Sequence, residues 1–166
     1  MSPLSATIAL WPEMPVLPPP DHPFLIRVAT SLDRSVARGE LRSALRTLLS
    51  AWSQIPEDRL PLLETSLGPS WHGELAGHSL GASLAYATAE GWIGLVRGAR
   101  IGVDAVELEA VADPGAVARH YFSPELHKSI EESSDPAGAF AEAWTGLEAR
   151  LKCRRCSSAG APSDRA

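Results

Sequence analysis

The amino-acid sequence predicts an α+β fold in which antiparallel strands pack against helices. Three short apolar runs in the middle of the chain are separated by glycine-containing pairs, a spacing typical of an antiparallel meander. On both sides of these runs, leucine and aromatic residues recur at helical spacing. With 166 residues, 45% of them hydrophobic and 21% charged, the chain can bury one substantial core or two small lobes that share an interface.

The N-terminal part predicts an extended lead-in followed by a helix. Residues 1–24 carry much of the proline, which removes backbone donors and blocks helix interiors. From Ser31 the pattern becomes helical, and Ile55-Pro56 ends it. Pro56 also opens a short helix that we expect to run to Glu64. The apolar face of the long helix consists of Leu41, Leu45, Leu48, Leu49 and Trp52.

Three strands are predicted in the middle of the chain, after a turn at Gly68-Pro69. We expect them at Ser83–Ala89, Trp92–Val96 and Arg100–Asp104.

Three helices are predicted after the strands, each opened by a capping residue and a proline. The first runs from Asp113-Pro114 to about Tyr121, and the second has Ser123 as N-cap and Pro124 at its first position. The third has Asp135 as N-cap before Pro136. Its apolar stripe consists of Phe140, Trp144, Leu147 and Leu151. Residues 153–166 are small, polar and without periodicity, so we expect a disordered tail.

Composition argues against several classes of protein. A net charge of −5 disfavours nucleic-acid binding, which needs a basic face. The apolar runs are far shorter than the ~20 residues of a membrane span, and a basic signal-peptide segment is absent from the N-terminus. The two cysteines, Cys153 and Cys156, exclude a disulfide scaffold and favour a cytoplasmic setting. As a lone pair they are a weak signal for metal or redox chemistry.

Three charged residues are the first candidates for chemistry. Asp104 follows Gly102-Val103 at the expected end of a strand, where loops present side chains to ligands, although aspartate is also a common turn residue. Glu148 and Lys152 stand four residues apart on the third helix and project from the same side. Taken alone, they are equally well an ordinary surface ion pair.

In combination, these residues resemble the signature segments of the 4′-phosphopantetheinyl transferase superfamily. The matching segments are Ile101-Gly102-Val103-Asp104, Phe122-Ser123-x-Glu125 and Phe140-x-x-x-Trp144-Thr145-x-x-Glu148-Ala149-x-x-Lys152. Upstream, Gly77-His78-Ser79 is similar to a histidine–serine pair of the two-lobed, Sfp-like branch. The resemblance covers about residues 30–152 and is strongest at its C-terminal end.

The resemblance implies a pseudo-two-fold pair of small α/β lobes, with the second lobe incomplete because the chain is C-terminally shortened. The N-terminal lobe would span 25–80 and the C-terminal lobe 81–152, with a lead-in at 1–24 and a tail at 153–166. The implied activity is Mg²⁺-dependent transfer of 4′-phosphopantetheine from coenzyme A to a serine of an apo carrier protein. The carrier would be an acyl or peptidyl carrier protein of fatty-acid, polyketide or nonribosomal peptide synthesis.

The resemblance also implies a role for each matching residue. Asp104 and Glu148 would bind Mg²⁺, which prefers hard oxygen ligands. Lys152 and His78 would hold coenzyme A phosphates. Glu125 would help to deprotonate the attacking serine, directly or through water. Two of these residues have structural alternatives: a carboxylate in the first turn of a helix, as at Glu125, is favoured by the helix dipole, and His78 can be a loop histidine.

Two substitutions depart from the family pattern. Leu147 stands where the family usually has a lysine, and Val106 where it often has a second acid. They motivate an alternative, a degenerate homologue that binds coenzyme A or a carrier protein without catalysis. A third interpretation is a small α+β interaction domain whose motif match is accidental. The row of Arg38, Arg42 and Arg46 is a candidate for the nucleotide's 3′-phosphate by charge alone, or else a solvated helix face.

Overall fold

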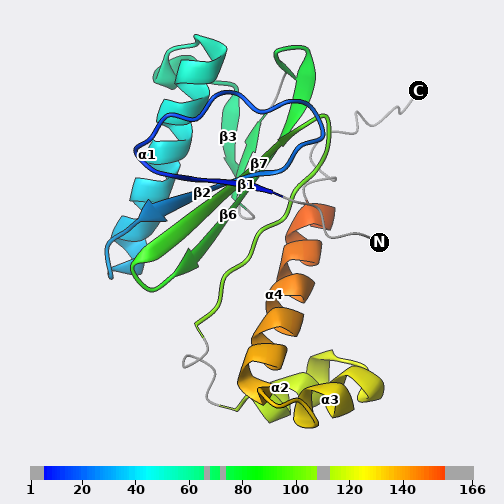
Figure 1. The fold of residues 1–166 in the computed structure, drawn as a ribbon. Helices are drawn as coiled ribbons and strands as arrows, with labels where there is room; N and C mark the ends of the chain where they lie inside the picture. Colours follow the sequence, from blue (N-terminus) through cyan, green and yellow to red (C-terminus); the bar gives the residue numbers. More distant parts are fainter. Residues whose placement is uncertain (1–5, 66–67, 72–73, 108–112, 156–166) are drawn as a thin grey trace, which may run out of the picture.

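The computed structural model describes residues 6–65, 68–71, 74–107 and 113–155, and it confirms the α+β fold (Figure 1). The strands are β1 (Thr7–Leu10), β2 (Phe24–Ala29), β3 (Leu62–Thr65), β4 (Gly68–Trp71), β5 (Glu74–Leu75), β6 (His78–Ala87) and β7 (Glu90–Arg97). The helices are α1 (Arg34–Ser53), the 3-10 turn η1 (Glu57–Arg59), α2 (Pro114–Tyr121), α3 (Pro124–Glu131) and α4 (Pro136–Arg155).

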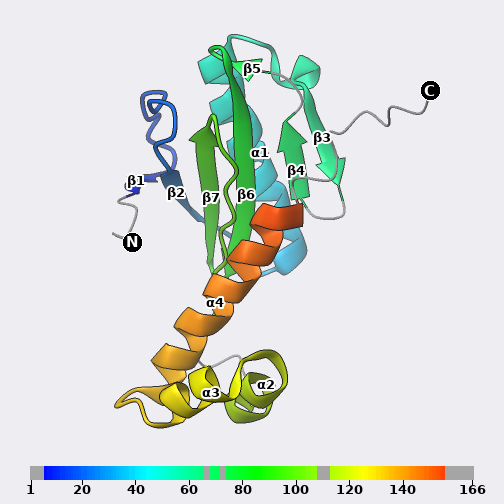
Figure 2. The same cartoon turned by 90° about the vertical axis from the view of Figure 1, so that its right-hand side faces the viewer.

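The main sheet has the order β1-β2-β7-β6-β5, and β3 and β4 form a separate hairpin. β1 pairs with β2 in parallel, and the other neighbours pair antiparallel. Helix α1 covers one face of the sheet, whereas residues 100–107 and the C-terminal half of α4 cover the other (Figure 2). Helices α2 and α3 pack on the first half of α4, away from the sheet.

Helix α1 forms where the leucine periodicity predicted it. The Asp33 carboxylate accepts hydrogen bonds from the backbone N–H groups of Ser35 and Val36 and so caps the first turn. The helix ends at Gln54, which adopts a left-handed conformation with φ 60°. The predicted apolar face is buried apart from Trp52, which is half-buried against the core. Burial of each leucine contributes about 1.5–3 kcal/mol.

The proline-rich lead-in is part of the folded body. It contains β1, and its loop after β1 is held by two side chains from the core. The indole Nε1 of Trp52 donates to the carbonyl of Pro15, and the buried guanidinium of Arg97 donates through Nε and Nη2 to the carbonyl of Pro18. These bonds satisfy carbonyls in a segment where proline leaves few backbone donors.

Of the three expected strands, the first two form, and the prediction of the third is wrong. β6 and β7 pair from Leu80 with Arg97 to Ala87 with Glu90. The third run, Arg100–Asp104, crosses the face of β6 and β7 instead of extending the sheet, and in the described chain it makes no backbone–backbone hydrogen bond. Gly81 explains this crossing, because a side chain there would lie 3.1 Å from the Cα of Arg100.

Two other boundaries also differ from the prediction. The short helix expected to run to Glu64 is a single 3-10 turn ending at Arg59, because the following Leu62–Thr65 pairs with β4. Residues 153–155, which were expected in the tail, are helical, because α4 continues to Arg155. The rest of the predicted tail, 156–166, lies outside the described residues. The division of the chain into lobes stays a prediction.

The three C-terminal helices begin at the predicted caps and form a second, small core. The Ser123 hydroxyl accepts from the N–H of Leu126, and the Asp135 carboxylate accepts from the N–H of Gly138. Ala118, Ile130 and Phe140 are buried in this three-helix cluster, with Phe122 and Trp144 packed against them. Leu147 and Leu151, which the stripe also predicted to be apolar contacts, are half-buried and belong to neither core.

Candidate functional site

The structure brings Asp104 and Lys152 together between the sheet and α4. The ammonium of Lys152 lies 2.7 Å from Oδ1 of Asp104, 3.0 Å from the carbonyl oxygen of Val103 and 3.3 Å from the carbonyl oxygen of Leu84. The side chain of Asp104 is 15% exposed and that of Lys152 30%. An ammonium group has three donors, so Lys152 can satisfy all of them with protein oxygens.

Close packing of two backbones creates this contact. A side chain on Gly102 would lie 2.8 Å from the backbone nitrogen of Cys153 and 2.9 Å from the carbonyl carbon of Ala149. The missing side chain at Gly102 therefore lets residues 100–107 touch the helix backbone directly. The N–H of Val103 donates to the hydroxyl of the buried Ser83, which fixes the segment on β6. The missing side chain at Gly102 and the hydrogen bond to Ser83 thus set the register that places Asp104 beside Lys152.

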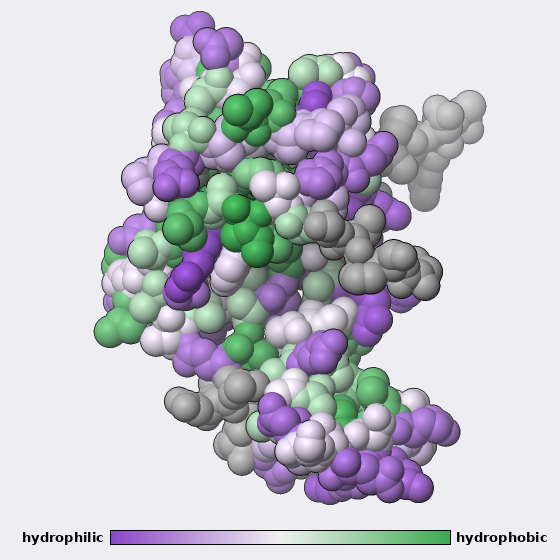
Figure 3. Space-filling view, viewed as in Figure 1, coloured by the Kyte–Doolittle hydropathy of each residue, from purple (hydrophilic) through white to green (hydrophobic). Residues whose placement is uncertain are grey.

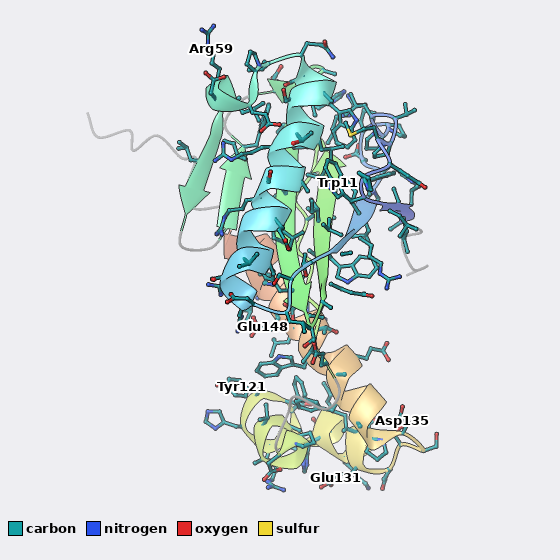
Figure 4. The ribbon with its side chains drawn as sticks, turned by 90° about the vertical axis from the view of Figure 1, so that its left-hand side faces the viewer. Trp11, Arg59, Tyr121, Glu131, Asp135 and Glu148 are labelled. Atoms are coloured by element: carbon teal, nitrogen blue, oxygen red, sulfur yellow. The ribbon has the colours of Figure 1, made fainter. Side chains whose placement is uncertain are left out.

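Glu148 lies on α4 (Figure 4). It precedes Lys152 by four residues, one helical turn or about 6 Å along the helix axis. It is half-buried, and within the described residues it has no hydrogen bond or ion pair. The described parts of the chain contain no group of three or more histidine, cysteine, aspartate or glutamate side chains that could hold a metal ion. A cation at this place would therefore depend on few carboxylates and would retain water or ligand oxygens.

His78 is not close to these residues. It begins β6 and is half-buried, six residues before Leu84. At the rise of a strand this separation is about 20 Å.

Glu125 also lies elsewhere, exposed in the first turn of α3 in the three-helix cluster. This cluster packs on α4 at Phe140, about 18 Å along the helix from Lys152. Hydrogen bonds from its own backbone N–H and from the Ser123 side chain hold the pKa of Glu125 below its usual range. A lower pKa makes this carboxylate a weaker base.

The arginine row lies on α1, on the opposite face of the sheet from Asp104. The guanidinium of Arg38 lies 5.8 Å from the centre of the Tyr86 ring, a distance that suits a cation–π contact. Glu107, the acid after Val106, accepts a hydrogen bond from the backbone N–H of Thr88 at the β6–β7 turn. Glu107 is therefore engaged with the sheet end and not with Lys152.

A groove opens beside Asp104, between α4 and the strands β1, β2 and β7. Its volume is about 530 Å³, and Figure 3 shows apolar surface on this side of the molecule. Glu142 and Trp92, which line the groove, were not predicted as site residues. The helical spacing of Glu142, Thr145 and Ala149 was the signal that could have indicated this face of α4. Its lining includes the side chains of Ile8, Leu25, Trp92, Asp104, Glu142 and Thr145.

Residues 100–164 match the family model of the 4′-phosphopantetheinyl transferase superfamily. The match confirms the family that the motifs predicted, and it covers less than half of the chain. It includes Asp104, Glu125, Glu148 and Lys152, whereas His78 and the arginine row precede it. No curated protein matches the chain.

The described residues also bear on membrane association. Within them, no helix combines the length and the apolar composition that a membrane span requires.

Proposed function

We propose that this chain transfers the 4′-phosphopantetheine group from coenzyme A to a serine of an apo carrier protein in a Mg²⁺-dependent reaction. The superfamily match supports phosphopantetheinyl transfer in general. The observation that carries the proposal is the direct contact of Lys152 with Asp104, which joins the two motif segments into one charged site. The acceptor would be a carrier protein of the holo-[acyl-carrier-protein] synthase reaction or its polyketide or peptide counterparts.

In this reaction the serine oxygen forms a bond to the phosphorus that carries pantetheine, and the pyrophosphate P–O bond breaks. Adenosine 3′,5′-bisphosphate leaves with the electron pair, and the serine proton passes to a base. Asp104 and Glu148 would hold Mg²⁺, whose charge stabilises the phosphate oxygens during such a transfer. Lys152 would bind a phosphate oxygen through its ammonium group. His78 is the proposed second contact for coenzyme A.

Glu125 is the proposed base, and its surroundings make it a weak one. Glu125 is exposed, and hydrogen bonds to its own backbone N–H and to Ser123 lower its pKa. A carboxylate of this kind accepts a proton less readily than one with a raised pKa. We therefore propose that Glu125 acts on the serine proton through a water molecule.

A second function is favoured by specific observations: a homologue that binds coenzyme A or a carrier protein without catalysis. Leu147 and Val106 replace charged residues of the family pattern. In addition, Lys152 directs its donors at three protein oxygens, so it must release at least one of them to bind a phosphate. Both features lower the number of charges available for transfer.

Intact mass spectrometry of an apo carrier protein, incubated with the chain, coenzyme A and Mg²⁺, tests the enzymatic proposal. Addition of phosphopantetheine is expected with the wild type, and its loss with Asp104→Ala. Glu132→Gln, which removes an exposed acid in the three-helix cluster, is the matched control and should retain transfer. If no carrier protein gains mass, the enzymatic proposal fails. Calorimetric titration with coenzyme A then separates a non-catalytic binder, which releases or absorbs heat, from a chain that does not bind.

A further inference from the structure

We propose that the Lys152 ammonium occupies the cation site beside Asp104, and that a divalent cation binds there only when Lys152 withdraws. The role of this site in catalysis rests on the proposed function. The competition between two cations for one set of oxygens can be measured without coenzyme A or a carrier protein.

The oxygens around Lys152 are those of a cation site. One carboxylate oxygen of Asp104 and the main-chain carbonyl oxygens of Val103 and Leu84 surround a single point, at 2.7, 3.0 and 3.3 Å from the ammonium nitrogen. Carboxylate and carbonyl oxygens are also the ligands that Mg²⁺ and Ca²⁺ accept. Because the Lys152 nitrogen already lies at that point, a metal ion and this nitrogen exclude each other.

Charge balance gives a second reason for exclusion. Asp104 and Glu148 are the two carboxylates that we assign to the site, and Lys152 supplies one positive charge. A divalent cation added while Lys152 still contacts Asp104 would place three positive charges beside the single negative charge of Asp104 in a partly buried region. Val106 supplies no further carboxylate that would offset this excess. Like charges at such short range repel strongly where solvent screening is weak.

The structure also offers Lys152 an alternative partner. Glu148 lies four residues earlier on α4, the spacing at which glutamate and lysine pair on a helix surface. Within the described residues, Glu148 has no other hydrogen bond or ion pair. Rotation of the Lys152 side chain toward Glu148 would free these three oxygens for a cation held by Asp104 and the two carbonyls. A phosphate group at the site would give the ammonium another partner and release Glu148 to the metal.

Binding of Mn²⁺ alone, followed by electron paramagnetic resonance, tests this competition on the full chain. Lys152→Met keeps the length of the side chain and removes its charge, and we expect it to bind Mn²⁺ about tenfold or more tightly than the wild type. The double variant Lys152→Met/Asp104→Asn should lose this gain. Lys128→Met removes an exposed lysine that pairs with Glu132 on the helix surface, and it should bind Mn²⁺ like the wild type.

Equal Mn²⁺ affinity in wild type and Lys152→Met would overturn the proposal, as would a gain that persists without Asp104. Circular dichroism establishes that each variant is folded, and Lys152→Gln, which retains a polar end, replaces Lys152→Met if that variant unfolds. Failure of the transfer assay with a normal Mn²⁺ competition would reject the enzymatic function and keep this inference. Successful transfer together with equal Mn²⁺ affinity in wild type and Lys152→Met would keep the enzymatic function and reject this inference.

Discussion

Replacement of Gly102 by alanine should destabilise the fold by separating the two motif segments. The new methyl group would lie 2.8 Å from the backbone nitrogen of Cys153, 2.9 Å from the carbonyl carbon of Ala149 and closer still to the oxygen of Ala149. These are backbone atoms, so the strain is relieved only if α4 and residues 100–107 move apart. Overpacking of this kind costs about 1–3 kcal/mol. The lower entropy of the unfolded alanine variant offsets about 0.4–1 kcal/mol of that cost.

The matched control is Gly39→Ala on α1. A methyl group at Gly39 meets no atom within 4 Å, and alanine is favoured over glycine in a helix by about 1 kcal/mol. The two variants should therefore differ by about 1–4 kcal/mol in the free energy of unfolding, which separates their melting temperatures by roughly 2–16 °C. Urea unfolding and calorimetry measure both quantities. If Gly102→Ala is as stable as Gly39→Ala, the close approach of residues 100–107 to α4 is not a feature of the folded protein.

Three further changes test how the elements are held. Two hydrogen bonds from Ser35 and one from Val36 lower the pKa of Asp33, so its stabilisation of α1 is complete above the unfolded pKa and disappears as pH falls through the lower folded value. Asp33→Asn, which caps without titrating, should flatten this acid dependence in unfolding measured from pH 7 to 3; an unchanged pH profile would contradict it. Arg97→Met should cost about 1–3 kcal/mol, because the Pro18 carbonyl loses both donors, and should expose residues 11–22 to limited proteolysis; an unaltered urea midpoint speaks against this. Ser83→Ala leaves the N–H of Val103 without its partner and should lower the unfolding free energy by about 1 kcal/mol, whereas wild-type stability would show that this bond contributes nothing.

The helices were predictable because their signals are local. Asp113, Ser123 and Asp135 each stand before a proline, and in the structure each caps the helix that follows through its own side chain. Such a bond involves residues two or three positions apart, so it can be read from the sequence without knowledge of the tertiary structure. The buried leucines of α1 follow from periodicity for the same reason.

The path of residues 100–107 could not be predicted in this way. Arg100–Asp104 has the composition of a strand, but whether it extends the sheet or crosses its face depends on the space above β6 and β7. Gly81 and Gly94 provide that space: a side chain on Gly94 would lie 3.2 Å from Cδ1 of Ile101. Periodicity carries no information on such contacts between distant segments. Likewise, i, i+4 spacing predicted that Glu148 and Lys152 lie on one side of α4, but not that Lys152 turns to Asp104.

The residues of the two motif segments can serve the packing of the fold as well as catalysis. Gly102 allows two backbones to touch, and Asp104 and Lys152 form an ion pair at the place where they meet. The packing of this chain therefore accounts for the glycine, and the ion pair joins the segment to the helix, whether or not phosphopantetheine is transferred. A variant that preserves the packing and changes only the charge, such as Lys152→Met, separates the two requirements. If it remains folded and binds Mn²⁺ more tightly than the wild type, the lysine serves the site as a cation and not as a brace between segment and helix.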